Sequence, residues 1–236
     1  MEQGFSPNYN KRSSSAIIDM IIIHYTVINL QQTIRVFKDK NKQVSSHYVI
    51  AEDGKIFQPV LDKYRAWHAG VSYFAGRKDI NSYSIGIELV NNGKEEFTTQ
   101  QYKALESLIK LLKNQHPIKD HYILGHSDVA PQRKIDPGKF FAWQKLAAVG
   151  HGFYVDLAVP DFNAEIVKLY SKNIQVKNLQ TDLKNFGYEI SNDGIFGPKT
   201  LNVIKSFKTH FCPKTNCEIW DNYAHLVLHQ LSKKLG

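Results

Sequence analysis

A short apolar run, AIIDMIIIH at residues 16–24, constrains the fold of this chain more than any other feature. In a β-strand alternate side chains point to opposite faces, so Met20 and Ile22 share one face with His24, and the isoleucines between them occupy the other. Both faces are apolar, which is the pattern of an interior strand covered on each side. The run ends in histidine, so we expect this strand to deliver an imidazole to the rim of a sheet.

The next segments predict a helix and a hairpin. Leu30, Ile34 and Phe37 recur at helical spacing. The segment YVIAEDGKIFQPV at residues 48–60 predicts a hairpin that turns at Asp53-Gly54, because this dipeptide favours a tight turn.

A long aromatic loop at 62–82 follows, and we expect it to form part of a groove wall. Thr98 or Thr99 should then cap a helix, and the strand HYILGH should end at His126. The apolar stripe of that helix is Tyr102, Leu105, Leu108, Ile109 and Leu112. Strands that alternate with helices predict the α/β class, with a mixed β-sheet flanked by helices.

Length and composition predict a globular protein. The 236 residues suffice for one medium domain with a sizeable core and one small domain. With 42% hydrophobic and 22% charged residues, the chain contains no run of 18 apolar residues that could span a membrane. Its first residues, MEQGFSPNYNKRSS, lack an apolar stretch, so we expect no signal peptide and no transmembrane segment.

The net charge of +8 is spread along the chain. Nine lysines and five acidic residues give +4 in residues 171–236, which leaves +4 for residues 1–170. A diffuse positive field favours anionic polymers or acidic peptides. We expect no nucleic-acid partner, since the chain shows no helix-turn-helix, no RNP-like aromatic motif and no clustered arginines.

The segment HSDVAPQRKIDPG at residues 126–138 brings an imidazole, an ammonium and a carboxylate together. If it is extended, Lys134 and Asp136 share a face and Ile135 turns into the core. A catalytic zinc needs three protein ligands and an open position. Besides His126 and Asp136, His24 is the best candidate for the third ligand.

Glu88 lies in a second predicted strand, SYSIGIELV. Ser84 and Gly86 share its face, and the glycine leaves room for a ligand to approach, while the apolar residues of the strand face the other way. Without the zinc motif, a surface or salt-bridged glutamate would be the ordinary interpretation.

With these residues, the chain resembles the zinc-dependent N-acetylmuramoyl-L-alanine amidases of the type-2 amidase family, in the AmpD and AmiD branch. An aspartate at the third ligand position is typical of that branch. The matching segments occur in family order and cover about two-thirds of the chain. They are IIIHYT around His24, SSHYVIAEDGKIFQPV (45–60), AWHAG (66–70), NSYSIGIELVN (81–91) and GHSDVAPQRKIDPGKFFAW (125–143).

The resemblance implies a role for each site residue. His24, His126 and Asp136 would bind Zn²⁺, and Glu88 and Lys134 would be the catalytic side chains. Glu88 would act as general base, and Lys134 would stabilise an oxyanion. The implied reaction is hydrolysis of the amide bond between N-acetylmuramic acid, or its anhydro form, and L-alanine of the stem peptide. Peptidoglycan or muropeptides would therefore be the partners.

Other side chains in the matching segments are candidate substrate-binding residues: Tyr25, His47, Trp67 and His68. The two histidines among them could instead donate hydrogen bonds to the zinc site or be structural. Six further histidines have no motif around them, and we assign them no role: His116, His121, His151, His210, His225 and His229.

The pattern changes at residues 159–173. We expect domains at 1–160 (zinc amidase) and 174–236 (helical), joined by a linker helix at 161–173. The helices of the second unit should span roughly 174–186, 198–210 and 221–234, with Gly197-Pro198 as a helix start. This small three-helix unit resembles a peptidoglycan-binding domain. Alternatively, it is an extension that stabilises the first domain.

Two questions stay open at the level of sequence. Cys212 and Cys217 could form a disulfide in an oxidising compartment or remain free in a reducing one. The extra domain favours a periplasmic or envelope location, with the cytoplasm as the alternative.

The main rival function is a catalytically silent peptidoglycan-binding protein. A glycosidase that uses Glu88 and Asp136 would leave the two histidines and Lys134 without a role.

Overall fold

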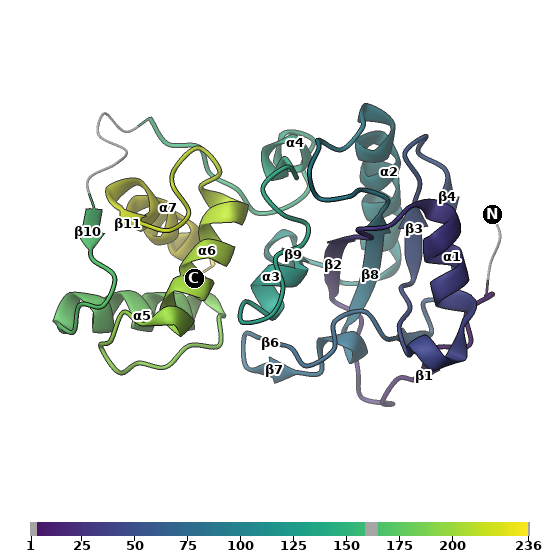
Figure 1. Ribbon diagram of the computed structural model, residues 1–236, viewed down its shortest axis with the longest axis horizontal. Coiled ribbons are helices and arrows are strands. Elements are labelled where there is room, and N and C mark those ends of the chain that lie inside the picture. The colour runs from purple at the N-terminus through teal and green to yellow at the C-terminus, as the bar shows by residue number, and fades with distance from the viewer. Residues whose placement is uncertain (1–3, 159–164, 236) are drawn as a thin grey trace.

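The computed structural model describes residues 4–158 and 165–235. A five-stranded sheet organises the first part, in the order β4-β3-β8-β2-β9. All pairs are parallel except β4 with β3. The strands are β2 (Met20–Tyr25), β3 (Tyr48–Ile50), β4 (Ile56–Phe57), β8 (Ser84–Leu89) and β9 (Ile123–Gly125). The mixed sheet with flanking helices confirms the predicted α/β class (Figure 1).

Helices begin where the sequence supplies caps. In α1 (Leu30–Lys38), Asn29 and Gln32 form a reciprocal capping box, and in α2 (Thr99–Gln115), Thr98 and Gln101 do the same. The predicted apolar stripe of α2 is buried throughout. Two short helices follow, α3 (His126–Val129) and α4 (Trp143–Ala148). The remaining elements of this part are β1 (Tyr9–Lys11), η1 (Lys40–Lys42), β5 (Tyr64–Ala66), β6 (Tyr73–Phe74), β7 (Arg77–Lys78), η2 (Ile80–Ser82) and η3 (Asp120–Tyr122).

The C-terminal part contains the three predicted helices, α5 (Ile174–Phe186), α6 (Pro198–Phe211) and α7 (Asn222–Lys233). Pro198 occupies the first turn of α6, as expected for a residue with no N–H to donate. The predicted linker helix was wrong over 165–173. That stretch contains β10 (Glu165–Val167), which pairs with β11 (Trp220–Asp221), and residues 161–164 lie outside the described part of the chain.

The segment after α3 also differs from the prediction. Ile135 is 73% exposed and does not enter the core. The backbone N–H groups of Arg133 and Lys134 both donate to Ala130 O, so the chain turns here instead of extending. Alternation between two faces therefore does not apply to this segment.

Strand β2 lies between β8 and β9, and its residues 20–23 have no exposed surface. On one face of the sheet, Ile21 and Ile23 pack in a cluster with α2 and α4. On the other face, Met20 and Ile22 belong to a larger cluster that includes the buried side chains of α5, α6 and α7. The C-terminal helices lie at the left of Figure 1, beside α3 and α4, and they share this cluster with one face of the sheet.

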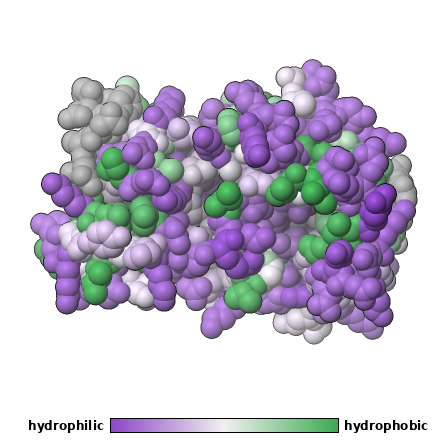
Figure 2. All heavy atoms as spheres, in the orientation of Figure 1, coloured by the Kyte–Doolittle hydropathy of each residue, from purple (hydrophilic) through white to green (hydrophobic). Residues whose placement is uncertain are grey.

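Around this core the molecule has an ordinary polar exterior. The face shown in Figure 2 is mostly hydrophilic, with hydrophobic residues in small separate patches. Cys212 and Cys217 are free, and no disulfide joins them. Cys212 is buried, and this burial raises the pKa of its thiol.

Because one core joins the two parts of the chain, we expect a single unfolding transition. Phe207 of α6 has no exposed surface and contacts Tyr188 and Trp220. Phe207→Ala should lower the free energy of unfolding by about 3–5 kcal/mol and shift the whole transition. Scanning calorimetry of the full chain measures this. Two separate transitions, of which only one moves in the variant, would show that the parts unfold independently.

Candidate active site

The site forms at the carboxyl edge of the sheet. His24 near the end of β2 and Glu88 near the end of β8 are register partners on adjacent parallel strands, so their side chains leave the sheet on the same face. His126 directly follows β9, the neighbour of β2 on its other side. Glu88 and His126 are far from His24 along the chain, but they lie beside it in the fold. The three parallel strands that carry or precede these residues end at the same edge of the sheet.

Three side chains converge on one point. His24, His126 and Asp136 each offer a ligand atom, and these atoms lie within 4.8 Å of one another. His24 Nδ1 lies 2.9 Å from Asp136 Oδ2, and His126 Nδ1 lies 3.0 Å from both of these atoms. Ligands of a tetrahedral zinc at about 2.0–2.1 Å are roughly 3.3 Å apart, so two imidazoles and a carboxylate in this arrangement fit such an ion.

The second nitrogen of each imidazole is also held. With Nδ1 directed at the cluster, His24 carries its proton on Nε2 and donates to His68 Nδ1 at 3.1 Å. His68 in turn donates from Nε2 to Ser84 Oγ at 3.3 Å, and Ser84 donates to Ile80 O at 2.7 Å. This chain of donors sets the tautomer of His24 and the orientation of its ring.

His126 is supported by the residue next to His68. Its Nε2 donates to Ala69 O at 3.1 Å. Asn81 Oδ1 accepts from the backbone N–H groups of both His68 and Ala69, at 3.1 and 2.7 Å. Arg133 also donates to Ala69 O. The side chain of Asn81 therefore anchors the short segment that orients both histidines of the cluster.

The protonation states suit a cation. Burial, together with the neighbouring His126, lowers the pKa of His24 to about 4, so its imidazole is neutral at pH 7. Burial alone would raise the pKa of Asp136, but hydrogen bonds from His126 and His24 outweigh that effect and hold it well below its usual range. An ionised carboxylate beside a neutral imidazole is the form in which these groups bind metals.

Glu88 is the exception among the carboxylates of the site. Its Oε2 is buried and has no hydrogen-bond partner within the described part of the chain. Burial and the charge of Asp136 raise the pKa of Glu88 to about 8, whereas the ammonium of Lys134 lowers it. A cavity of about 180 Å³ leads to Glu88 between the end of β2 and α1, with Thr26 and Thr33 among its lining residues.

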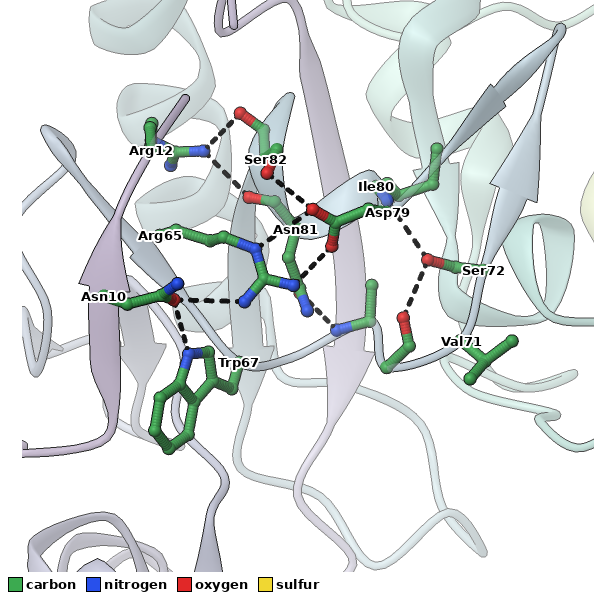
Figure 3. Close-up of polar contacts among 12 residues, drawn as sticks. Asn10, Arg12, Arg65, Trp67, Val71, Ser72, Asp79, Ile80, Asn81 and Ser82 are labelled. Atoms are coloured by element: carbon green, nitrogen blue, oxygen red, sulfur yellow. Dashed lines mark hydrogen bonds and ion pairs between the residues drawn. The ribbon is translucent and has the colours of Figure 1, made fainter. Parts of the chain in front are cut away.

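The predicted groove wall at 62–82 borders a larger cavity of about 720 Å³. Figure 3 shows its polar scaffold: Arg65 lies between Asp79 and Asn10, and Trp67 donates from Nε1 to Asn10 Oδ1. Arg12 donates to the backbone oxygens of Asn81 and Ser82. Arg12 thus ties this wall to η2, which contains the Asn81 that accepts hydrogen bonds from His68 N and Ala69 N.

The predicted substrate-binding residues divide into two pairs. His47 is fully buried and contacts Gly86 N and Arg12, which favours the structural alternative for this residue. Both ring nitrogens of His68 have partners in the chain of contacts around His24, which favours the alternative that His68 supports the zinc site. Tyr25 and Trp67 are partly exposed, Tyr25 with its ring beside Gly138, and their contact with substrate stays a prediction.

Sequence reasoning missed several residues that build the site. Asn81 opens the matching segment at 81–91, but nothing in its spacing distinguishes it from a loop asparagine. Asp128 and His210 are joined by a buried hydrogen bond, although no sequence motif surrounds His210. Their contact joins positions 82 residues apart, and no local pattern encodes such a pairing.

Comparison with known proteins identifies the family. The model of the N-acetylmuramoyl-L-alanine amidase family matches residues 13–139. The chain belongs to this family. Enzymes of the family are metal hydrolases, and the amidase cleaves the bond between N-acetylmuramic acid and L-alanine. A second model, of a putative peptidoglycan binding domain, matches residues 172–216.

Individual relatives agree with the family assignment. AmiD of Escherichia coli (strain K12) is 32% identical over 259 residues, which cover 100% of the amidase and 90% of that relative. AmpD of Haemophilus influenzae is 35% identical over 159 residues, covering 59% and 86%. The solved complex of E. coli AmiD with anhydro-N-acetylmuramic acid-L-Ala-D-gamma-Glu-L-Lys has a TM-score of 0.81 at 29% identity, covering 96% and 93%.

In its described residues the amidase has no helix that is both long and apolar enough to cross a membrane.

The raised pKa of Glu88 predicts that the free energy of unfolding of the metal-free amidase falls as pH rises. A carboxyl group whose folded pKa is raised stabilises the fold below its unfolded pKa and loses this contribution as pH rises toward about 8. Glu88→Gln cannot ionise, so its advantage in melting temperature over wild type should grow from pH 5 to pH 8. We expect it to reach about 1–3 kcal/mol in unfolding free energy. Chelator-treated protein should be melted across this range, with exposed Glu52→Gln as the control. A constant difference would contradict the assignment.

Proposed function

We propose that this amidase is zinc-dependent and that His24, His126 and Asp136 hold the ion. The observation that carries the proposal is the convergence of their three ligand atoms beside Glu88, whose buried carboxylate oxygen is unpaired. A donor set of two imidazoles and one carboxylate suits zinc in a hydrolytic site that leaves one position open. Bound there, zinc would lower the pKa of a water to about 7 and polarise a carbonyl.

In this proposal Glu88 transfers a proton and Lys134 stabilises negative charge. Glu88 takes the proton of the attacking water on Oε2 and later delivers it to the nitrogen of the departing L-alanine. The ammonium of Lys134 stabilises the negative charge that develops on the lactyl carbonyl oxygen. The same ammonium lowers the pKa of Glu88, which helps to keep the base ionised.

The substrate in this proposal is a muropeptide with an anhydro or an ordinary muramic acid. The solved AmiD complex supports this choice, because its substrate is an anhydro-N-acetylmuramic acid tripeptide. The partly exposed rings of Tyr25 and Trp67 offer faces for sugar or peptide, and Trp67 lines the large cavity.

For the chain as a whole, we assign catalysis to residues 1–160 and peptidoglycan binding to residues 174–236, with 161–173 as the link. The match of residues 172–216 supports the second role. A unit that binds the wall is useful where wall is present, so we assign the amidase to the periplasm or cell envelope.

A glycosidase would use Glu88 and Asp136 as an acid and base pair. Asp136 Oδ2 instead contacts His24 Nδ1 and His126 Nδ1, as expected for a carboxylate that shares a metal with two imidazoles. A glycosidase would leave these two histidines and Lys134 without a role, so we favour the amidase.

The product masses test the reaction. Purified sacculi and anhydro-muropeptide should be digested side by side, and free stem peptides that begin with L-alanine should appear. His126→Ala should lose about one equivalent of zinc together with activity. Shortened glycans would indicate a glycosidase, the absence of any product would indicate a silent binding protein, and full zinc with full turnover in the variant would refute the ligand set.

Glu88 and Lys134 should fail in different ways. Glu88→Gln keeps the shape but cannot accept a proton, so zinc should stay bound while kcat falls by roughly 10²–10⁴. Lys134→Ala should lower kcat by a similar order with little change in KM, and should move the acidic limb of the pH profile upward.

Zinc content, kcat, KM and pH profiles should be measured for both variants. Lys139→Ala, an exposed lysine five residues further on, is the matched control and should behave as wild type. A Glu88→Gln enzyme with near-normal kcat and full zinc would place the base elsewhere.

A further inference from the structure

Asp128 is a fully buried carboxylate at the boundary between the two parts of the chain. Its Oδ2 accepts from Gly125 N at 2.8 Å and from His210 Nδ1 at 2.7 Å. Its Oδ1 accepts from the hydroxyl of Tyr188 at 2.6 Å and from Ser206 Oγ at 3.4 Å. A buried carboxylate needs such donors on both oxygens, because it has lost its water.

Three of these four donors come from the C-terminal unit. Tyr188 follows α5, and Ser206 and His210 lie on successive turns of α6. The ring of His210 is stacked between Trp143 of α4, with centroids 3.6 Å apart, and Phe211, at 3.8 Å. The imidazole is therefore fixed in orientation, and its Nδ1 cannot leave Asp128 without breaking this stack.

The fourth donor connects Asp128 to the metal cluster. Gly125 is the N-cap of α3, and His126 is the first residue of that helix, so Asp128 closes the turn in which His126 begins. Two residues after Gly125, Ser127 N donates to Asp136 O at 2.9 Å. The single turn of α3 thus carries one ligand residue and is bonded to the backbone of another.

We propose that the C-terminal unit is part of the metal centre, with Tyr188, Ser206 and His210 as positioning residues that act through Asp128 on His126. This inference rests on the proposed zinc site. Without its donors, the carboxylate of Asp128 must draw in water or turn away from Gly125 N, and α3 loses the contact that holds its first turn. The unit therefore contributes to cleavage of soluble substrates that need no anchoring to the wall.

Two substitutions test the network in the full-length protein. Tyr188→Phe removes one hydroxyl and nothing else. His210→Leu removes the donor while it keeps an apolar side chain between Trp143 and Phe211, and His210→Asn restores a donor near the position of Nδ1. Zinc affinity should be measured by competition with a chelator, and ligand geometry by the visible spectrum of the Co²⁺-substituted protein. The kcat and KM for a soluble muropeptide should be measured as well.

Matched controls separate positioning from general stability. Val227→Ala creates a small cavity in the fully buried core of α7, away from Asp128, and should lower the melting temperature without changing zinc affinity. His68→Phe removes the acceptor of His24 Nε2 directly, and should weaken zinc binding by about 10–100-fold.

We expect Tyr188→Phe and His210→Leu each to weaken zinc binding by about tenfold, to alter the Co²⁺ spectrum and to lower kcat more than they raise KM. His210→Asn should recover part of each loss. Unchanged zinc affinity and spectra in folded Tyr188→Phe and His210→Leu would overturn the inference, as would an equal effect of Val227→Ala. If the wild-type protein binds no zinc, the proposed function itself fails, and this inference fails with it.

Discussion

The parallel pairing of β2 with β8 and β9 is the interaction on which the site depends. The carboxyl ends of parallel strands lie at the same edge of the sheet, so His24, Glu88 and His126 lie close together there. The pairing is secured by the burial of β2 on both faces. A slip of one residue would turn His24 toward α2 and carry the apolar side chains of the strand to the wrong faces. The hydrophobic pattern that selects the register therefore also selects the position of the imidazole.

Two carboxylates of the site are driven in opposite directions by their surroundings. Asp136 has hydrogen bonds from two histidines, and its pKa is lowered, whereas Glu88 has a buried oxygen without a partner, and its pKa is raised. Both groups lose water, so the difference comes from the donors that each one finds. A ligand must stay ionised, and a base must be able to accept and release a proton. The same edge of the sheet provides both environments because Asp136 arrives on a turn between the two imidazoles.

Local patterns predicted much of this structure and long-range contacts limited the rest. The strand at β2, the hairpin at Asp53-Gly54 and the three C-terminal helices follow from side-chain periodicity and caps, which are properties of neighbouring residues. The convergence of the ligand residues came from a resemblance to a family. The strand β10 and the burial of His47 were not predicted, since each depends on a partner far away in sequence. The exposure of Ile135 was missed for another reason, because a local turn at Ala130 replaces the extended segment that was expected. The pairing of Asp128 with His210 is of the same kind.

The core shared by the sheet and the C-terminal helices bears on how such enzymes diversify. A wall-binding unit on a flexible tether can be exchanged for another by recombination, because neither partner has a surface adapted to the other. Here Met20 and Ile22 of β2 belong to one buried cluster with the helices of that unit. Replacement by an unrelated module would leave part of this cluster uncovered. The two parts are therefore expected to be inherited together and to change in step, with substitutions on one side of the boundary matched on the other.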